Sequence, residues 1–552
     1  MSAHSHSTST SYDAKIEAVN AVLRDIGMGR YQWALFFLIG FGYYADNLWP
    51  IITGLILPPV VNEFRGSRGP FINMGQGIGL LIGAIFWGAG SDIWGRRISF
   101  NITFLITGVF AVSAGASPNF AVLVTMVAFW SLGVGGNLPV DTSIFLEFTP
   151  STHQHLLTVL SVWWAFGQLV GSLVAWPLIG NPKFSCPSPS QSNVASYSCP
   201  ESQNRGWRYF LYAMGGLTLV MWLLRFFAFH LYETPKYLVG KGREKEAGEV
   251  LERVRRFNGR EKGEDIITLN DLLKLKPEGS DDRVSGEEKD DSQLGDRDVD
   301  GGVTGGGKGA VGNVKQRLVG WYSTGIPNEL SLNHVRPLFE TREKTVTTCL
   351  LMGVWGQSES FLLTPRKFLH LSVSDCIGVK RSINTKTISL ETRGATFGDG
   401  SVYTTYRNQV ILSAIGVPAA ILAGYLVSLP YLGRRGTLAL STLLTGVFIL
   451  VSTTSRSSNA LLGWNCAYTF TSNVMYGVLY GMTPELFESK DRGTANALTA
   501  ACNRVFGIMA PIIALYADLT TSVPIFIAGA IFVGAGMIAL LIPVESRDVE
   551  AR

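Results

Sequence analysis

The sequence predicts an all-α membrane protein built from two pseudo-symmetric six-helix bundles. Of its 552 residues, 47% are apolar and only 16% are charged, which is more apolar than an ordinary soluble domain. The apolar residues gather in segments of the length, about 20 residues, that crosses a bilayer. Lipid tolerates no unpaired backbone groups, and the segments lack the alternation of barrel strands, so we expect helices.

Eleven segments satisfy this requirement. They are Tyr31–Pro58, Phe71–Gly90, Ile98–Ala116, Phe120–Leu146, Leu156–Leu178, Tyr209–His230, Val410–Val427, Leu438–Thr453, Leu461–Leu479, Ala495–Leu515 and Val523–Ile542. Twelve spans are expected, because a shorter apolar stretch, Thr345 to Trp355, stands where a seventh would complete the second half. That seventh span is degenerate.

The boundaries between parts follow changes in composition. We expect a cytoplasmic N-terminal tail at 1–30, an N-terminal six-helix half at 31–238, a cytoplasmic loop at 239–340, a C-terminal half at 341–545 and a cytoplasmic tail at 546–552. The tail lacks the features of a signal peptide, so the first span should remain in the mature protein. In the loop, an amphipathic helix is predicted at Glu244–Phe257 and disorder at Glu278–Gly312.

A glycine-rich stretch in that loop, Gly302 to Gly309, has nearly the spacing of a phosphate-binding loop. Gly309 stands where that loop needs Ser or Thr, and no strand precedes it. We therefore expect no nucleotide and no other cofactor. No set of nucleophile, base and acid appears either, which argues against an enzyme.

Basic residues in the loops predict the orientation. Arg96 with Arg97, Arg434 with Arg435, and Lys490 with Arg492 fall in loops of one parity, which the positive-inside bias assigns to the cytoplasm. Both termini are then cytoplasmic, and we expect a multi-pass plasma-membrane protein. Basic clusters of this kind are typical of membrane-protein loops, so nucleic acid is not expected as a partner.

Two of the six cysteines, Cys186 and Cys199, fall in one predicted outer loop. A disulfide is expected there in an oxidising compartment, the alternative being two unpaired thiols. The other four cysteines lack metal-ligand spacing, so we predict no metal site.

Short sequences recur at matched junctions of the two halves. Gly88–Arg97 corresponds to Leu432–Arg435, and Leu146–Pro150 corresponds to Thr483–Phe487. A third pair, Tyr232–Lys236 and Pro543–Arg547, closes each half. These pairs imply an internal repeat of six helices.

The first junction also resembles a known family. Gly88–Arg97 matches the Gly-x-x-x-Asp-x-x-Gly-Arg-Arg signature of the major facilitator superfamily, and Glu233–Leu238 is similar to the motif that closes the first half of sugar porters. With Phe41–Asp46 and Gly135–Asp141, the chain resembles fungal members near the synaptic-vesicle-two-related, sugar-porter and phosphate-symporter branches. The resemblance implies the major facilitator fold and alternating access about a central site between the halves. We expect a monomer that carries out secondary transport of a small polar solute.

Charged side chains inside spans cost about 2.5–3.5 kcal/mol each at the bilayer centre and so point to function. Asp46 lies in the first span beside Tyr43, Tyr44 and Asn47. We interpret it as a proton-carrying carboxylate, with a structural hydrogen bond as the alternative. Related porters place an arginine in the fourth span, where this chain has Val127, so proton coupling stays open.

Two acids belong to the fourth span. Asp141 and Glu147 are six residues apart and do not share a helix face. We expect Asp141 to line the cavity with Asn137, and Glu147 to bond basic loop residues.

Two arginines lie within later spans. Arg504, beside Asn503, could bind an anionic solute, neutralise a buried acid, or form a salt bridge at the cytoplasmic end. Arg225 lies near the cytoplasmic end of the sixth span, where it can snorkel to the membrane surface, so we expect a structural role for it.

The signature loop itself predicts a conformational latch between helix ends, the alternative being a role in topology alone. Its residues are Gly88, Asp92, Gly95, Arg96 and Arg97, with Glu233, Arg434, Arg435, Glu485 and Arg492 as candidate partners.

The segment Gln357–Glu391 is predicted to be foreign to the fold. It carries several basic residues where the seventh span should continue, as a retained intron would produce; a genuine broken helix is the alternative. A transport-defective product of a mis-spliced gene is therefore kept as one alternative function. The other is a non-transporting membrane sensor on the same fold, which would signal through its long cytoplasmic loop.

Overall fold

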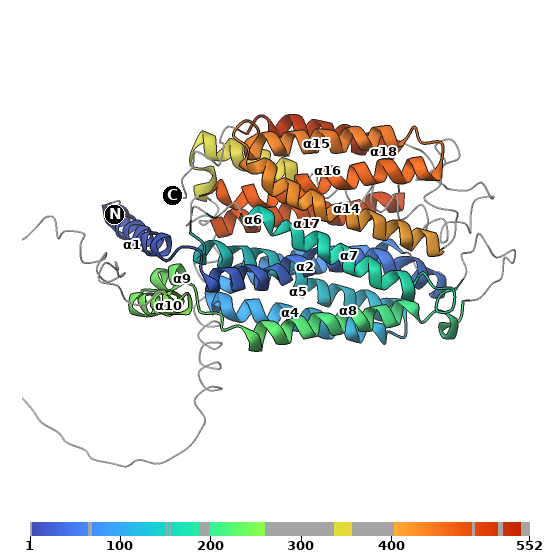
Figure 1. Cartoon of the computed structure of the whole chain (residues 1–552), viewed down its shortest axis with the longest axis horizontal. Coiled ribbons are helices and arrows are strands. Elements are labelled where there is room, and N and C mark those ends of the chain that lie inside the picture. Colours follow the sequence, from blue (N-terminus) through green and yellow to red (C-terminus); the bar gives the residue numbers. More distant parts are fainter. Residues whose placement is uncertain are drawn as a thin grey trace, which may run out of the picture.

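The computed structural model describes residues 3–64, 69–150, 153, 156–186, 199–259, 336–355, 402–487, 492–516 and 523–542. Within these ranges, the side chains at 3–14, 89, 92–94, 228, 336–337, 492–494, 497, 509–516 and 523–524 are not described. The predictions for Glu278–Gly312, Gly302–Gly309 and Gln357–Glu391 lie outside the described residues. Every regular element within the described ranges is a helix, and most of these helices lie side by side in one bundle (Figure 1).

The first half is formed by six segments. They are α2 (Arg30–Glu63), α3 (Pro70–Trp94), α4 (Arg96–Gly115), α5 (Phe120–Phe148), α6 with α7 (Leu156–Val159 and Ser161–Leu178), and α8 (Gly206–Leu223), which continues as a π-helix, Leu224–Ala228. All six are long and apolar enough to cross a membrane.

The second half contains a helix at 342–355 followed by five longer ones. These are α14 (Val402–Ser428), α15 (Gly433–Ser452), α16 (Ser458–Glu485), α17 (Arg492–Tyr516) and α18 (Val523–Ala539). Of the described helices here, α14 and α15 meet the criterion for a span. Several helices extend past the predicted apolar segments, because polar residues at their ends continue the helical backbone hydrogen bonds.

Glycines bring α5 close to its neighbours. A Cβ at Gly133 would lie 2.6 Å from the Thr103 carbonyl oxygen of α4, and one at Gly135 would collide with the Leu80 carbonyl of α3. Glycine has no side chain, so these helix backbones can approach closely, as in other membrane helix bundles. Glycine at these positions therefore allows α3, α4 and α5 to pack closely.

The halves meet along two pairs of helices, α3 with α17 and α7 with α14. Ser172 of α7 and Ser413 of α14 place their hydroxyl oxygens 2.9 Å apart. Tyr406 of α14 donates to the Leu55 carbonyl of α2 over 2.6 Å. On α16, a Cβ at Gly477 would lie 2.7 Å from the Ser161 hydroxyl. The halves are therefore in direct contact at several levels.

Three further helices form a cap at one end of the bundle, which we call the motif end because it carries the Arg96 loop (Figure 1). They are α1 (Ala3–Ile26), α9 (Pro235–Gly240) and α10 (Glu244–Phe257). The predicted amphipathic helix is confirmed as α10. The N-terminal segment, predicted only as a tail, is helical over most of its length and buries the side chains of Val19 and Leu23.

Polar contacts hold the cap in place. Lys15 of α1 reaches Glu244 of α10 over 2.6 Å, and Asn258 accepts from the Tyr31 backbone N–H over 2.8 Å at the start of α2. On its exposed side, hydrogen bonds from Arg243 lower the pKa of Glu246. The cap thus joins α1 and α10 to the first helix of the bundle.

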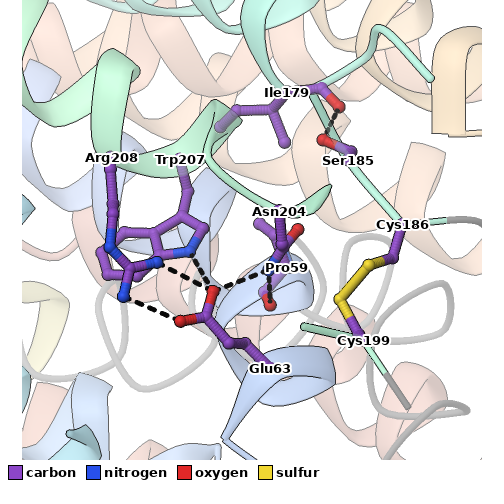
Figure 2. The surroundings of a disulfide bond; sticks show 9 residues. All are labelled: Pro59, Glu63, Ile179, Ser185, Cys186, Cys199, Asn204, Trp207 and Arg208. Atoms are coloured by element: carbon purple, nitrogen blue, oxygen red, sulfur yellow. Dashed lines mark hydrogen bonds and ion pairs between the residues drawn. A yellow bond between two sulfur atoms is a disulfide. The ribbon is translucent and has the colours of Figure 1, made fainter. Parts of the chain in front are cut away.

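The opposite end carries a disulfide between Cys186 and Cys199, so the predicted bridge is confirmed. Figure 2 shows it beside a polar cluster in which Glu63 of α2 accepts from Arg208 over 2.9 Å and from the Trp207 indole over 3.0 Å. We call this the disulfide end. The cluster joins α2 to α8 where the outer loop is predicted.

Candidate functional site

The two halves share a buried ion pair near the middle of the bundle. An Arg504 guanidinium nitrogen of α17 lies 3.3 Å from the Asp46 Oδ1 of α2, and the two side chains are 10% and 8% exposed. Two residues predicted as separate pathway residues therefore meet, although 458 positions separate them. Of the three roles considered for Arg504, neutralising a buried acid is the one this geometry displays.

An aromatic row crosses between the halves on the motif side of this pair. Tyr43 lies one turn before Asp46 and stacks on Trp164 of α7 with ring centroids 5.4 Å apart. Tyr480 of α16 meets Trp164 edge-on at 4.3 Å, and Trp355 meets Tyr480 at the same distance. We call these four residues the aromatic row.

Hydrogen bonds hold the two ends of the row. The Tyr43 hydroxyl lies 3.1 Å from the Thr142 hydroxyl, and the Trp355 indole donates to Thr483 over 2.9 Å. Sequence reasoning found Tyr43 and missed Trp164, Tyr480 and Trp355. Aromatic residues are common in spans, and only the rotation of each helix shows which ones face the other half.

Asp141 belongs to a different pair inside the first half. It accepts from Arg225 over 2.6 Å, and both side chains are fully buried. Arg225 also donates to the Phe100 carbonyl over 3.0 Å and lies over the Phe100 and Phe104 rings, 3.3 and 4.4 Å from their centroids. The expectation that Arg225 snorkels is wrong, because Asp141 and two aromatic faces hold it inside the bundle.

The remaining predicted pathway residues lie on the same helices as members of these pairs. Asn137 lies one turn before Asp141 on α5 and is fully buried, and Tyr44 and Asn503 are 7% and 1% exposed. Asn47 is half-buried on α2. The structure thus places Asp141 and Asn137 within the wall of the first half, while Asp46 and Arg504 lie where the halves meet.

The motif end contains equivalent ion pairs in the two halves. Arg96 pairs with Glu147, joining α4 to α5. At the matching place, Arg434 donates to Glu485 over 2.8 Å, joining α15 to α16. The expected partner of Glu147 is thereby found.

Other latch residues complete the same ends. The Arg96 backbone N–H donates to Glu233 over 3.1 Å, and Gly95 has a φ of 98°, which favours glycine. Arg435 donates to the Leu540 carbonyl, and Arg97 is exposed. The side chains of Asp92 and Arg492 lie outside the described residues.

Metal binding finds no support in the described part of the chain, where no group of three His, Cys, Asp or Glu side chains could hold an ion. The site instead offers a carboxylate, a guanidinium and aromatic faces between two helical halves. A carboxylate and a guanidinium between two helical halves suit the binding and release of a polar solute.

Comparisons with known proteins agree with this fold. Residues 76–274 match the family model described as sugar (and other) transporter. The chain is 45% identical to MFS siderochrome iron transporter 1 of Ceriporiopsis subvermispora, over 97% of this chain and 91% of that one. It is 33% identical to the major facilitator-type transporter hxnZ of Emericella nidulans, over 98% of this chain and 88% of that one.

A solved structure has the same architecture. The partially occluded, inward-open xylose transporter XylE of E. coli superposes with a TM-score of 0.58 at 14% identity, covering 93% of this chain and all of that one. These relatives are transporters and not enzymes. The chain therefore belongs to the major facilitator superfamily of membrane transporters.

Proposed function

We propose that this protein is a secondary active transporter that moves a small polar solute by alternating access, with Asp46 carrying the coupled proton. The observation that supports this proposal most directly is the ion pair between Asp46 and Arg504, which joins α2 of one half to α17 of the other. We further propose that it acts as a monomer in the plasma membrane with both termini in the cytoplasm.

Alternating access requires the halves to move relative to each other about a central site. A contact between α2 and α17 must then lengthen in at least one state. Separating a buried ion pair without compensation costs about 3–5 kcal/mol. Protonation of Asp46 removes one of the two charges and lowers that cost, which gives proton binding a direct effect on the conformational equilibrium.

The aromatic row is the barrier in this proposal. Trp164 and Tyr480 come from opposite halves and touch on the motif side of the Asp46 pair. Opening toward the motif end would separate these two rings. The ion pairs Arg96–Glu147 and Arg434–Glu485 lie at that same end and brace the helix ends that would have to move.

Counterflow in proteoliposomes tests transport itself. Purified protein is reconstituted, loaded with one unlabelled solute at a time and exposed to the labelled form outside. The panel contains sugars, organic acids and phosphate, together with a siderochrome–iron complex because a relative is named for that cargo. Counterflow of any solute supports the proposal, and its absence across the panel favours a sensor or a transport-defective product.

Asp46→Asn tests the proton-carrying role. We expect the variant to lose accumulation driven by a pH gradient and to keep counterflow, because the amide preserves size but cannot exchange a proton. Asp25→Asn is the matched control, since Asp25 is 48% exposed and pairs with Arg255 of α10 in the cap, away from the contact between the halves. Undiminished pH-driven accumulation by the Asp46 variant would refute the role.

A further inference from the structure

The geometry points to an anion-binding site at Arg504, in which the anionic group of the solute, a carboxylate or phosphate, takes the place that the Asp46 carboxylate occupies in this conformation. The inference rests on the proposed transport function and names the class of solute. It starts from the 3.3 Å contact between Arg504 and Asp46 Oδ1.

The Asp46–Arg504 and Asp141–Arg225 pairs are both buried, but they differ in a way that separates structural from exchangeable charge. Asp141 and Arg225 both come from the first half, and their side chains are 0% exposed. Arg225 is also held by the Phe100 carbonyl and two aromatic rings. No movement between the halves needs to disturb that pair.

The Asp46–Arg504 pair has the opposite character. Its members come from different halves, and each side chain keeps 8–10% of its surface accessible. A guanidinium binds carboxylate or phosphate through paired hydrogen bonds. Asp46 is therefore a carboxylate bound to Arg504 inside the protein, and it marks the position that an external anion would take.

Charge balance then links the anion to the proton. When Asp46 takes up a proton, Arg504 keeps its positive charge and loses the negative charge that lies 3.3 Å away, which favours the binding of another anion at that position. Binding a monovalent anion together with one proton leaves the total charge of the site unchanged. The solute would enter as the pair of a proton and an anion.

Binding measurements on the purified full-length protein test this site. The probes are acetate and benzoate, their neutral amides acetamide and benzamide, and inorganic phosphate, and the readout is ligand-dependent thermal stabilisation at pH 5.5 and 7.5. For wild type we expect stabilisation by carboxylates and not by amides. The affinity for carboxylates should rise as the pH falls, by up to about tenfold per pH unit if one proton binds with each anion.

Three variants assign the effect to this pair. Asp46→Asn should bind the carboxylates at pH 7.5 at least as tightly as wild type does at pH 5.5, and its affinity should not depend on pH. Arg504→Gln should bind no anion at either pH. The double variant, which removes both charges of the pair, should also bind none, and it serves if Arg504→Gln alone does not fold.

Arg243→Gln is the control for loss of a positive charge, because Arg243 lies on the exposed face of α10 and is 52% exposed. It should behave as wild type. Equal stabilisation by acids and amides, anion binding by the double variant, or no anion binding by wild type and Asp46→Asn would each overturn the inference.

The two proposals fail separately. A protein that shows counterflow of a neutral solute but binds none of these anions keeps its transport function and loses the anion site. A protein that binds anions through Arg504 but supports no counterflow would refute the proposed transport function and leave the anion site supported.

Discussion

Replacing Asp141 by Asn should destabilise the first half through Arg225. The variant leaves a fully buried guanidinium without its carboxylate partner, 2.6 Å away in the native structure. Breaking such a pair costs about 3–5 kcal/mol. Arg225 keeps its hydrogen bond to Phe100 and two ring faces, and cation–π contacts of this kind contribute about 2 kcal/mol when desolvated.

We therefore place the cost near the lower limit, at about 3 kcal/mol. With a slope of about 2 °C per kcal/mol, the low end of the range for domains of 150–250 residues, the apparent melting temperature should fall by about 6 °C. Intrinsic fluorescence of the 13 tryptophans in detergent-purified protein measures this midpoint.

A double-mutant cycle isolates the pair. The variant Asp141→Asn/Arg225→Gln carries no buried charge, so it should be less destabilised than the sum of the two single variants. Arg243→Gln, which breaks an exposed pair with Glu246, should not shift the midpoint. Additive effects of the two single changes, or a midpoint of Asp141→Asn equal to that of wild type, would refute the reasoning.

Three further substitutions have definite expectations. Gly42→Ala should sharply reduce the yield of folded protein, because the added Cβ would collide with Asp141 Oδ2. The control is Gly54→Ala on the same helix, whose Cβ would meet nothing within 4 Å and which should be tolerated. Equal yields of the two variants by size-exclusion chromatography would contradict this prediction. Asn258→Ala should lower stability by about 1 kcal/mol, because it removes the hydrogen bond to the Tyr31 N–H at the start of α2. Proteolysis of the three-helix cap should then be faster, and an unchanged cleavage rate would count against this contact. Glu485→Gln should slow counterflow and leave the solute preference unchanged, since it weakens the ion pair with Arg434 at the motif end and does not alter the central site. An altered solute preference would contradict the role of Glu485 in a conformational latch.

Much of the architecture could be predicted because local patterns determine it. The lengths of the apolar segments predicted the first-half spans, and the amphipathic spacing of residues predicted α10. The presence of two cysteines in one outer loop predicted the disulfide. The helical N-terminal segment had a signal too, since Val19, Val22, Leu23 and Ile26 repeat at three- and four-residue intervals.

The site was harder to predict because it depends on how distant helices are rotated. Asp46 and Arg504 could be recognised singly as costly charges within spans, but nothing local pairs residues 458 positions apart. Arg225 was misjudged for the same reason. Its position near a helix end suggested snorkelling, and only the fold shows that this face of α8 points at Asp141.

The cap has a consequence for synthesis of the chain on the ribosome. Lys15 of α1 and its partner Glu244 of α10 are 229 residues apart. At about 5–20 residues per second, α1 emerges roughly 10–50 seconds before α10 exists. Until then its apolar face, with Val19 and Leu23, has no partner within the cap. Docking of α1 therefore becomes possible only after the first six-helix half and α10 have been translated, at a time when α14–α18 have not yet been synthesised.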